Sequence, residues 1–210
     1  MINNIDAKCT IVGAGDFFGL RTPPKRGDLL IAADGGLDKL SGYSITPDII
    51  MGDFDSIKGG VSDLKAEIIR FPKEKDDTDM MLAVKEGLVR GYKDFRLYGG
   101  TGGRVDHFTA NMQTLVYIAR HGAIGWLYGE DFAVTAITDG RLGFNAREGA
   151  PVSIFAADGT AYGVTLSGLY YELSNAALSP DFPLGVSNKG LGGTACVEVK
   201  KGALLIVIYD

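Results

Sequence analysis

The stretch DLLIAADGG at residues 28–36 decides the fold class, because a short apolar run there ends at an aspartate and two glycines. A continuous apolar run of this length is typical of a strand buried on both faces of a parallel sheet. Helical spacing follows as far as Leu40, so we expect a strand, a tight turn and a short helix. A chain of such units folds as an α/β domain.

The same alternation of strand and helix extends on both sides of this stretch. Further strands are predicted at residues 7–12, near 49–51, at 68–71 and at 95–98. One helix is predicted from Asp76 or Asp77 to Gly91, since an aspartate can cap its first turn. A second helix is predicted at residues 105–119, where apolar side chains recur at helical spacing.

The second half of the chain has a different pattern. After about Trp126, helical periodicity gives way to short β-type runs that are separated by turn residues. Residues 151–159 predict a strand with a tight hairpin turn, and residues 194–208 predict a closing hairpin. We therefore expect two domains, an α/β domain at residues 1–125 and a β-rich domain at 126–210.

Composition excludes several classes of protein. The formal net charge of −5 argues against a surface that neutralises many nucleic-acid phosphates. The two cysteines, Cys9 and Cys196, lie far apart without a CxxC partner, so we expect neither a zinc site nor a disulfide framework. No apolar run reaches membrane-spanning length, and the first residues lack a signal pattern. We expect no nucleic-acid or membrane partner and a cytoplasmic location.

Two acidic motifs suggest a metal site. In GDFDS (residues 52–56), Asp53 and Asp55 are two apart in extended chain, so both carboxylates can point to one side, as Mg²⁺ ligands would. An aspartate-rich turn explains this motif equally well. In KDDTD (residues 75–79), helix capping accounts for one or two aspartates, and Asp79 is a candidate third ligand. Lys75 is a candidate to offset phosphate charge, although a solvated lysine is the ordinary case.

A glycine-rich loop lies between a predicted strand and a predicted helix. The stretch GGTGGR (residues 99–104) can bring backbone amides close to a phosphate, at the start of a helix that favours an anion. A flexible turn is the simpler reading, but Arg104, Asp106 and His107 follow at once and can orient a substrate. The loop matches neither the Walker A motif nor the dinucleotide fingerprint.

Taken together, five segments resemble the ordered motifs of the thiamine pyrophosphokinase family. They are ADGG (residues 33–36), PD (47–48), GDFDS (52–56), KDDTD (75–79) and GGTGGRVDH (99–107). The resemblance implies a Rossmann-like α/β domain with a mainly parallel sheet, followed by a C-terminal β-sandwich. It also implies a homodimer with active sites at the subunit interface. The implied reaction is Mg²⁺-dependent transfer of a diphosphate group from ATP to the hydroxyl of thiamine, which gives thiamine diphosphate and AMP.

The resemblance also implies site residues, which we carry over position by position. It assigns magnesium to Asp53, Asp55 and Asp79, and catalysis to these three with Arg104 and Asp106. It places ATP or substrate near Asp34, Gly35, Lys75, Asp76, Thr78, Gly102, Gly103 and His107. In the β-rich domain it assigns thiamine to Tyr171, Ser174, Asn175, Ser187 and Asn188. Tyr171 stands where the family often has a tryptophan.

Other functions stay open at this point. The same acidic site would serve a diphosphokinase of another heterocyclic alcohol, such as hydroxymethylpterin, and only the pocket in the β-rich domain would distinguish the two. A non-catalytic thiamine or nucleotide sensor is disfavoured, because converging carboxylates repel one another without a cation. A plain nucleotide hydrolase is a further alternative. The proton acceptor is also open, with Asp106 as one candidate.

Overall fold

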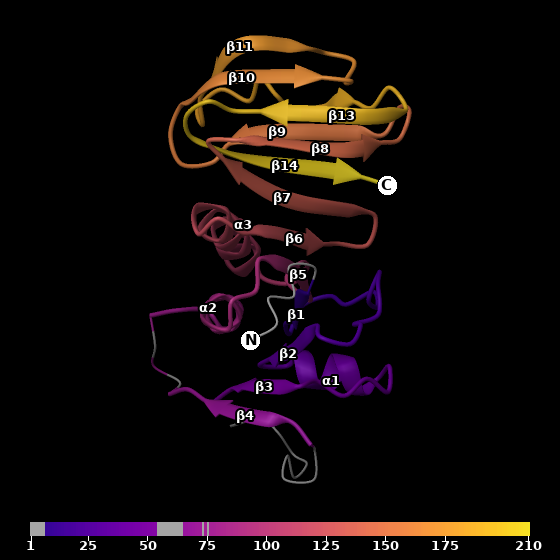
Figure 1. The fold of residues 1–210 in the computed structure, drawn as a ribbon, viewed down its shortest axis with the longest axis vertical. Coiled ribbons are helices and arrows are strands. Elements are labelled where there is room, and N and C mark those ends of the chain that lie inside the picture. The colour runs from indigo at the N-terminus through magenta and orange to yellow at the C-terminus, as the bar shows by residue number, and fades with distance from the viewer. Residues whose placement is uncertain (1–6, 54–64, 73, 75) are drawn as a thin grey trace. The chain divides into compact units, whose positions relative to one another are not determined.

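The computed structural model describes residues 7–53, 65–72, 74 and 76–210, and its fold is mixed α/β (Figure 1). The chain divides into two compact units. The first comprises Met1–Thr114 and Leu127–Glu130, and the second comprises Leu115–Trp126 and Asp131–Asp210. Helix α3 (Val105–Arg120) and strand β6 (Ile124–Tyr128) therefore contribute residues to both units.

The first unit contains a parallel sheet with the strand order β5-β1-β2-β3-β4. The strands are β1 (Lys8–Val12), β2 (Leu29–Ala33), β3 (Ile49–Gly52), β4 (Glu67–Arg70) and β5 (Asp94–Tyr98). Every residue of β2 and β3 is buried, as expected for strands covered on both faces. The parallel sheet that the sequence predicts is confirmed.

Two helices cover opposite faces of this sheet (Figure 1). Helix α1 (Gly36–Ser41) packs Leu37 and Leu40 against apolar side chains such as Val12. Helix α2 (Asp79–Val89) lies against the other face, where a Cβ added to Gly87 would come within 2.8 Å of the Cys9 sulfur. The predicted capping aspartates are wrong, because α2 is capped by Thr78, whose hydroxyl accepts a hydrogen bond from the Met81 N–H at 3.2 Å.

The second unit is built from antiparallel pairs in two sheets, with the orders β12-β9-β14-β7 and β11-β10-β13-β8. Its strands are β7 (Phe132–Thr138), β8 (Arg141–Ala146), β9 (Pro151–Ala156), β10 (Ala161–Ser167), β11 (Leu173–Leu178), β12 (Asn188–Lys189), β13 (Gly193–Glu198) and β14 (Ala203–Tyr209). One buried apolar cluster draws side chains from both sheets, including Ile154, Val164, Val197 and Ile206.

Both predicted hairpins of this unit are wrong. Strand β13 pairs with β8 and β10, whereas β14 pairs with β7 and β9. Likewise β9 pairs with β14 and β12, whereas β10 pairs with β11 and β13. Each strand buries alternate side chains in the shared core, so a short turn that carries the chain from one sheet to the other satisfies the same pattern as a hairpin.

Within the described part of the chain, no helix is both long enough and apolar enough to cross a bilayer.

Candidate active site

A cavity of about 300 Å³ opens in the first unit at the carboxyl ends of β1, β2 and β5. Its wall includes residues 13–15 after β1, Asp34 after β2, and residues 99–104 after β5. Thr78 and Asp79 complete it at the start of α2. Ligands of open parallel sheets bind at this end of the strands, because loops that follow neighbouring strands meet there.

Two glycine loops of this wall are held together through their backbones. The Gly15 N–H donates to the Gly99 carbonyl at 2.8 Å, and the Asp16 N–H donates to the Thr101 carbonyl at 2.9 Å. A Cβ added to Gly15 would lie 2.5 Å from the Thr101 oxygen and 2.7 Å from that of Gly99. Gly102 has a φ of +74°, which favours glycine. In this part of the wall the two loops pack so closely that a side chain at Gly15 would push their backbones apart.

Carboxylates follow two adjacent strands and begin a helix at the same edge. Asp34 has a φ of +52°, and its N–H donates to the Met51 carbonyl at 2.7 Å, which ties the end of β2 to that of β3. Asp53 comes one residue after β3, and Asp79 lines the same cavity as Asp34. Carboxylate oxygens of this kind suit a hard cation such as Mg²⁺. Asp55 lies outside the described residues.

A set of three metal-binding side chains is absent from the part of the chain that the structure describes. This statement concerns His, Cys, Asp and Glu side chains among the described residues, to which Asp55 does not belong. Asp53 and Asp79, two of the three predicted ligands, are described, and their carboxylates are the kind of oxygen donor that Mg²⁺ takes. The complete ligand set stays a prediction.

Arg104 and Asp106 form a two-point ion pair at the start of α3. The Arg104 Nη2 lies 2.5 Å from the Asp106 Oδ2, and its Nε lies 3.1 Å from Oδ1. Both side chains are largely exposed, at 73% and 62%. The hydrogen bond from Arg104 lowers the pKa of Asp106 from 3.8 to about 2. The Asp106 carboxylate thus occupies the guanidinium fork that could bind a phosphate.

Two aromatic side chains project from the second unit beside the residues predicted to bind thiamine. Tyr170 and Tyr171 are 64% and 61% exposed, and their rings meet edge to face with centroids 4.8 Å apart. Asn188, which accepts a hydrogen bond from the Tyr171 N–H, is 3% exposed. These exposed rings offer a surface on which a flat ligand can stack.

Two models of protein families match the sequence. "Thiamin pyrophosphokinase, catalytic domain" matches residues 24–124, and "Thiamin pyrophosphokinase, vitamin B1 binding domain" matches residues 141–204. The chain belongs to the thiamin pyrophosphokinase family. The first match includes every residue of the cavity wall except residues 13–15, and the second lies within the unit that carries Tyr170 and Tyr171.

Individual members of the family agree with this assignment. Thiamine pyrophosphokinase of Bacillus subtilis (strain 168) is 26% identical over 184 residues, which cover 85% of this chain and 86% of that protein. A crystal structure of thiamine pyrophosphokinase from Bacillus subtilis matches with a TM-score of 0.86 at 24% identity, covering 97% of this chain and 99% of the other. The yeast thiamin pyrophosphokinase structure matches at 0.75 and 16% identity, covering 99% and 88%. These structures share the mixed α/β fold.

The residues implied by resemblance to thiamin pyrophosphokinase are distributed unevenly. The cavity wall includes Asp34, Thr78, Asp79, Gly102, Gly103, Arg104 and His107. Gly35, Asp53, Asp76 and Asp106 are described but are not part of that wall, while Asp55 and Lys75 lie outside the described residues. In the second unit, Tyr171 and Asn188 are hydrogen-bonded to each other, and Ser174, Asn175 and Ser187 are exposed. Their roles in catalysis and binding stay predictions.

Sequence reasoning missed the contribution of residues 13–15, because their spacing fails the dinucleotide fingerprint. The useful signal was a Gly-x-Gly directly after a buried strand, which lets the chain approach a neighbouring loop. Asn111 was also missed. Its side-chain amide donates to the Gly100 carbonyl at 2.8 Å, so α3 holds the glycine loop from within the unit.

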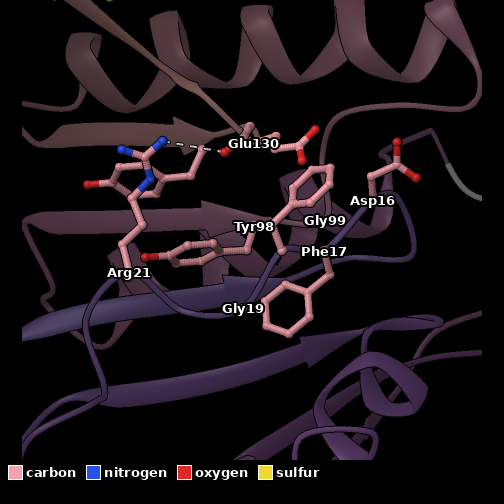
Figure 2. A pocket seen from close by; sticks show the side chains of 10 residues that line it. Asp16, Phe17, Gly19, Arg21, Tyr98, Gly99 and Glu130 are labelled. Carbon is pink, nitrogen blue, oxygen red and sulfur yellow. Dashed lines mark hydrogen bonds between the residues drawn. The ribbon is translucent and has the colours of Figure 1, made fainter. Parts of the chain in front are cut away.

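An aromatic cluster lies beside Gly99, the first residue of this glycine loop (Figure 2). A small cavity of about 50 Å³ lies there among residues that include Phe17, Arg21, Tyr98 and Glu130. The Arg21 guanidinium carbon lies 5.0 Å from the centre of the Tyr128 ring, and the Arg21 Nη2 donates to the Gly129 carbonyl at 3.5 Å. Burial raises the pKa of Tyr98 to about 12, so its hydroxyl stays protonated. These contacts hold Arg21, in the loop that follows β1, against Tyr128 and Gly129.

Proposed function

We propose that this chain is a thiamine pyrophosphokinase, which transfers a diphosphate group from ATP to the hydroxyl of thiamine and releases AMP. The observation that carries the proposal is the cavity of the first unit. It joins a glycine loop, an arginine fork and carboxylates at the carboxyl edge of a parallel sheet. A triphosphate with its cation needs these groups together, because the amides and arginine bind phosphate oxygens while the carboxylates bind the cation.

The glycine loop and Arg104 hold the phosphates. Residues 99–103 line the cavity just before α3, with Gly102 and Gly103 exposed, and the dipole of that helix favours an anion there. Arg104 exchanges its contact with Asp106 for a phosphate oxygen, since both acceptors fit the same fork. His107 lies one turn further along the wall and can orient the substrate.

Asp53 and Asp79 would hold Mg²⁺, together with Asp55. When bound, this ion neutralises negative charge on the phosphate oxygens. The chain's own contribution is position, because the hydroxyl of thiamine must attack the β-phosphorus in line with the departing AMP oxygen. Asp106 is a weak proton acceptor while Arg104 holds it, with a pKa of about 2. Transfer of Arg104 to phosphate would make this carboxylate more basic.

The second unit would supply the thiamine site. Tyr171 offers an exposed ring for the heterocycle of thiamine, and Ser174, Asn175 and Ser187 offer polar groups on nearby segments of the same unit. We extend the proposal to a Rossmann-like domain at residues 1–125, a β-sandwich at 126–210, and a homodimer whose active sites lie at the subunit interface. A cytoplasmic location is part of the same proposal.

One assay tests the function. Purified protein is incubated with ATP, Mg²⁺ and thiamine, and with each of the three omitted in turn, and the products are separated by chromatography. We expect AMP and thiamine diphosphate in equal amounts, and neither when any component is omitted. ADP and phosphate formed without thiamine would contradict the proposal and identify a nucleotide hydrolase. Faster turnover of hydroxymethylpterin than of thiamine would instead identify the other diphosphokinase.

A further inference from the structure

Asn188 is buried at a position where a substrate contact is predicted. It lies in β12, its backbone pairs with Val152 of β9, and only 3% of the residue is exposed. A buried side-chain amide must find hydrogen-bond partners within the protein, since an unsatisfied amide costs free energy. The partners of Asn188 therefore indicate what the side chain does.

The side-chain amide of Asn188 forms two hydrogen bonds with the backbone of Tyr171, one with its N–H and one with its carbonyl, and we call this pair the clasp. Its Oδ1 accepts from the Tyr171 N–H at 2.9 Å, and its Nδ2 donates to the Tyr171 carbonyl at 2.7 Å. The same Oδ1 accepts from the Lys189 N–H at 2.8 Å. Exchanging the oxygen and nitrogen of the amide would oppose two donors with a donor, so the hydrogen-bond network determines the orientation.

Neighbouring backbone contacts extend this clasp. The Tyr170 N–H donates to the Lys189 carbonyl at 2.9 Å, and Leu169 forms a β-bridge with Gly190. The backbone of residues 169–171 is thus held against residues 188–190. Tyr171 as a whole nevertheless stays 61% exposed. An exposed ring on an anchored backbone is preorganised, because little backbone freedom is left to lose when a ligand binds.

We propose that Asn188 is a positioning residue of the thiamine site, which acts through Tyr171 and does not touch the substrate. Both lone pairs of Oδ1 are used, and one hydrogen of Nδ2 is used, on a side chain that is almost fully buried. The inference rests on the proposed function, since it assigns the Tyr171 ring to the heterocycle of thiamine. The sequence predicts that Asn188 contacts thiamine, whereas in this inference Tyr171 makes the contact and Asn188 supports Tyr171.

A double-mutant cycle on the full-length protein tests this role. We measure kcat and the KM values for thiamine and ATP in Asn188→Ala, Tyr171→Ala and the double variant. Asn188→Ala should raise the KM for thiamine by about tenfold and change that for ATP by less than about twofold. In the Tyr171→Ala background, the same change should alter the KM for thiamine by less than about twofold, because the ring it positions is gone.

A second measurement tests the clasp without thiamine. Hydrogen exchange of the Tyr171 amide should be at least about tenfold faster in Asn188→Ala than in the wild-type protein. Asn188→Asp keeps both acceptor bonds, so it should protect this amide better than Asn188→Ala and serves if the alanine variant folds poorly. Asn145→Ala is the matched control at an exposed asparagine of β8, and it should leave both the KM for thiamine and the exchange of the Tyr171 amide unchanged.

The outcomes separate the inference from the function on which it rests. Non-additive effects on the KM for thiamine, with faster exchange at Tyr171, support the positioning role. Additive effects in an active enzyme would overturn it, because they mean that Asn188 contacts thiamine by itself. Unchanged exchange at Tyr171 would overturn the clasp. A wild-type protein without thiamine-dependent turnover would overturn the proposed function, and with it the substrate half of this inference.

Discussion

The glycine-lined cavity of the first unit differs in construction from the exposed pair Tyr170 and Tyr171 of the second unit, which we call the corner. The cavity is made of backbone so close-packed that a Cβ at Gly15 would lie 2.5 Å from a carbonyl oxygen. The corner presents large side chains, and a buried amide, Asn188, holds their backbone. Phosphate is bound by amides that must approach it closely, whereas a flat heterocycle needs a ring surface. We therefore expect substitutions in the cavity to change activity and stability more than substitutions at the corner change the KM for thiamine.

The largest effect is expected from loss of a carboxylate in the cavity. Asp79→Asn should lower kcat on the order of 10²–10³-fold, because a charged ligand of the cation becomes neutral. The Mg²⁺ concentration for half-maximal activity should rise as well. Steady-state kinetics across a Mg²⁺ series measures both.

The matched control for this change is Asp77→Asn. Asp77 precedes α2, and its carboxylate lies 2.6 Å from the ammonium of Lys85 in that helix, outside the cavity wall. This variant should keep kcat within about twofold, since a partly exposed ion pair contributes little. Equal loss in the two variants would mean that the segment, and not the Asp79 ligand, is what matters.

The next effect concerns the contact between the two glycine loops. Gly15→Ala should lower the free energy of unfolding by about 2–3 kcal/mol and weaken ATP binding, because its Cβ would meet two carbonyl oxygens. Gly103→Ala meets no atom within 4 Å, so only its φ of +61° is strained, at a cost of about 1 kcal/mol. Urea unfolding measures the first quantity and calorimetric titration with ATP the second. Equal destabilisation of the two variants would rule out a close backbone contact.

A smaller and graded effect is expected at the corner. Tyr171→Trp should lower the KM for thiamine by about two- to fivefold, because a larger ring adds stacking surface. Tyr171→Ala should raise it by about tenfold, with ATP kinetics nearly unchanged. The KM for thiamine in both variants is the measurement, and an equal rise in both would show that the ring does not face the substrate.

The smallest effect concerns pH. Because the pKa of Asp106 is lowered to about 2 from 3.8, its ion pair with Arg104 favours the folded state above pH 3.8, and this contribution is lost as the pH falls through about 2. Carboxyl ¹³C NMR should find Asp106 titrating near 2 in the wild-type protein and near 3.8 in Arg104→Ala. A titration that is the same in both proteins would exclude the pair in solution.

The sequence predicts the first unit better than the second for a physical reason. Buried parallel strands such as Leu29–Ala33 are continuous apolar runs, which few other elements resemble. In the second unit, the turn around Gly202 has the composition of a hairpin turn but joins strands of two different sheets. Strand periodicity reports which face is buried and does not report which strand is the neighbour.

The candidate site shows the same limit. GDFDS and the glycine loop could be predicted because each follows a strand, where ligands of parallel sheets bind, and KDDTD because it begins a helix. Burial of Asn188 could not be predicted, since an asparagine between a serine and a lysine looks like a surface residue. Only the tertiary contact with Tyr171, seventeen residues away, shows that its amide is used inside the protein.

Binding of a divalent cation tests the central claim most directly. Mn²⁺ binding is followed by electron paramagnetic resonance, in the presence of a non-hydrolysable ATP analogue, for the wild-type protein, Asp53→Asn and Asp79→Asn. We predict that each substitution weakens Mn²⁺ binding by about tenfold or more, because each removes a charged oxygen ligand. Unchanged Mn²⁺ affinity in both variants would contradict the account, since the carboxylates at the end of β3 and at the start of α2 would then not share one cation.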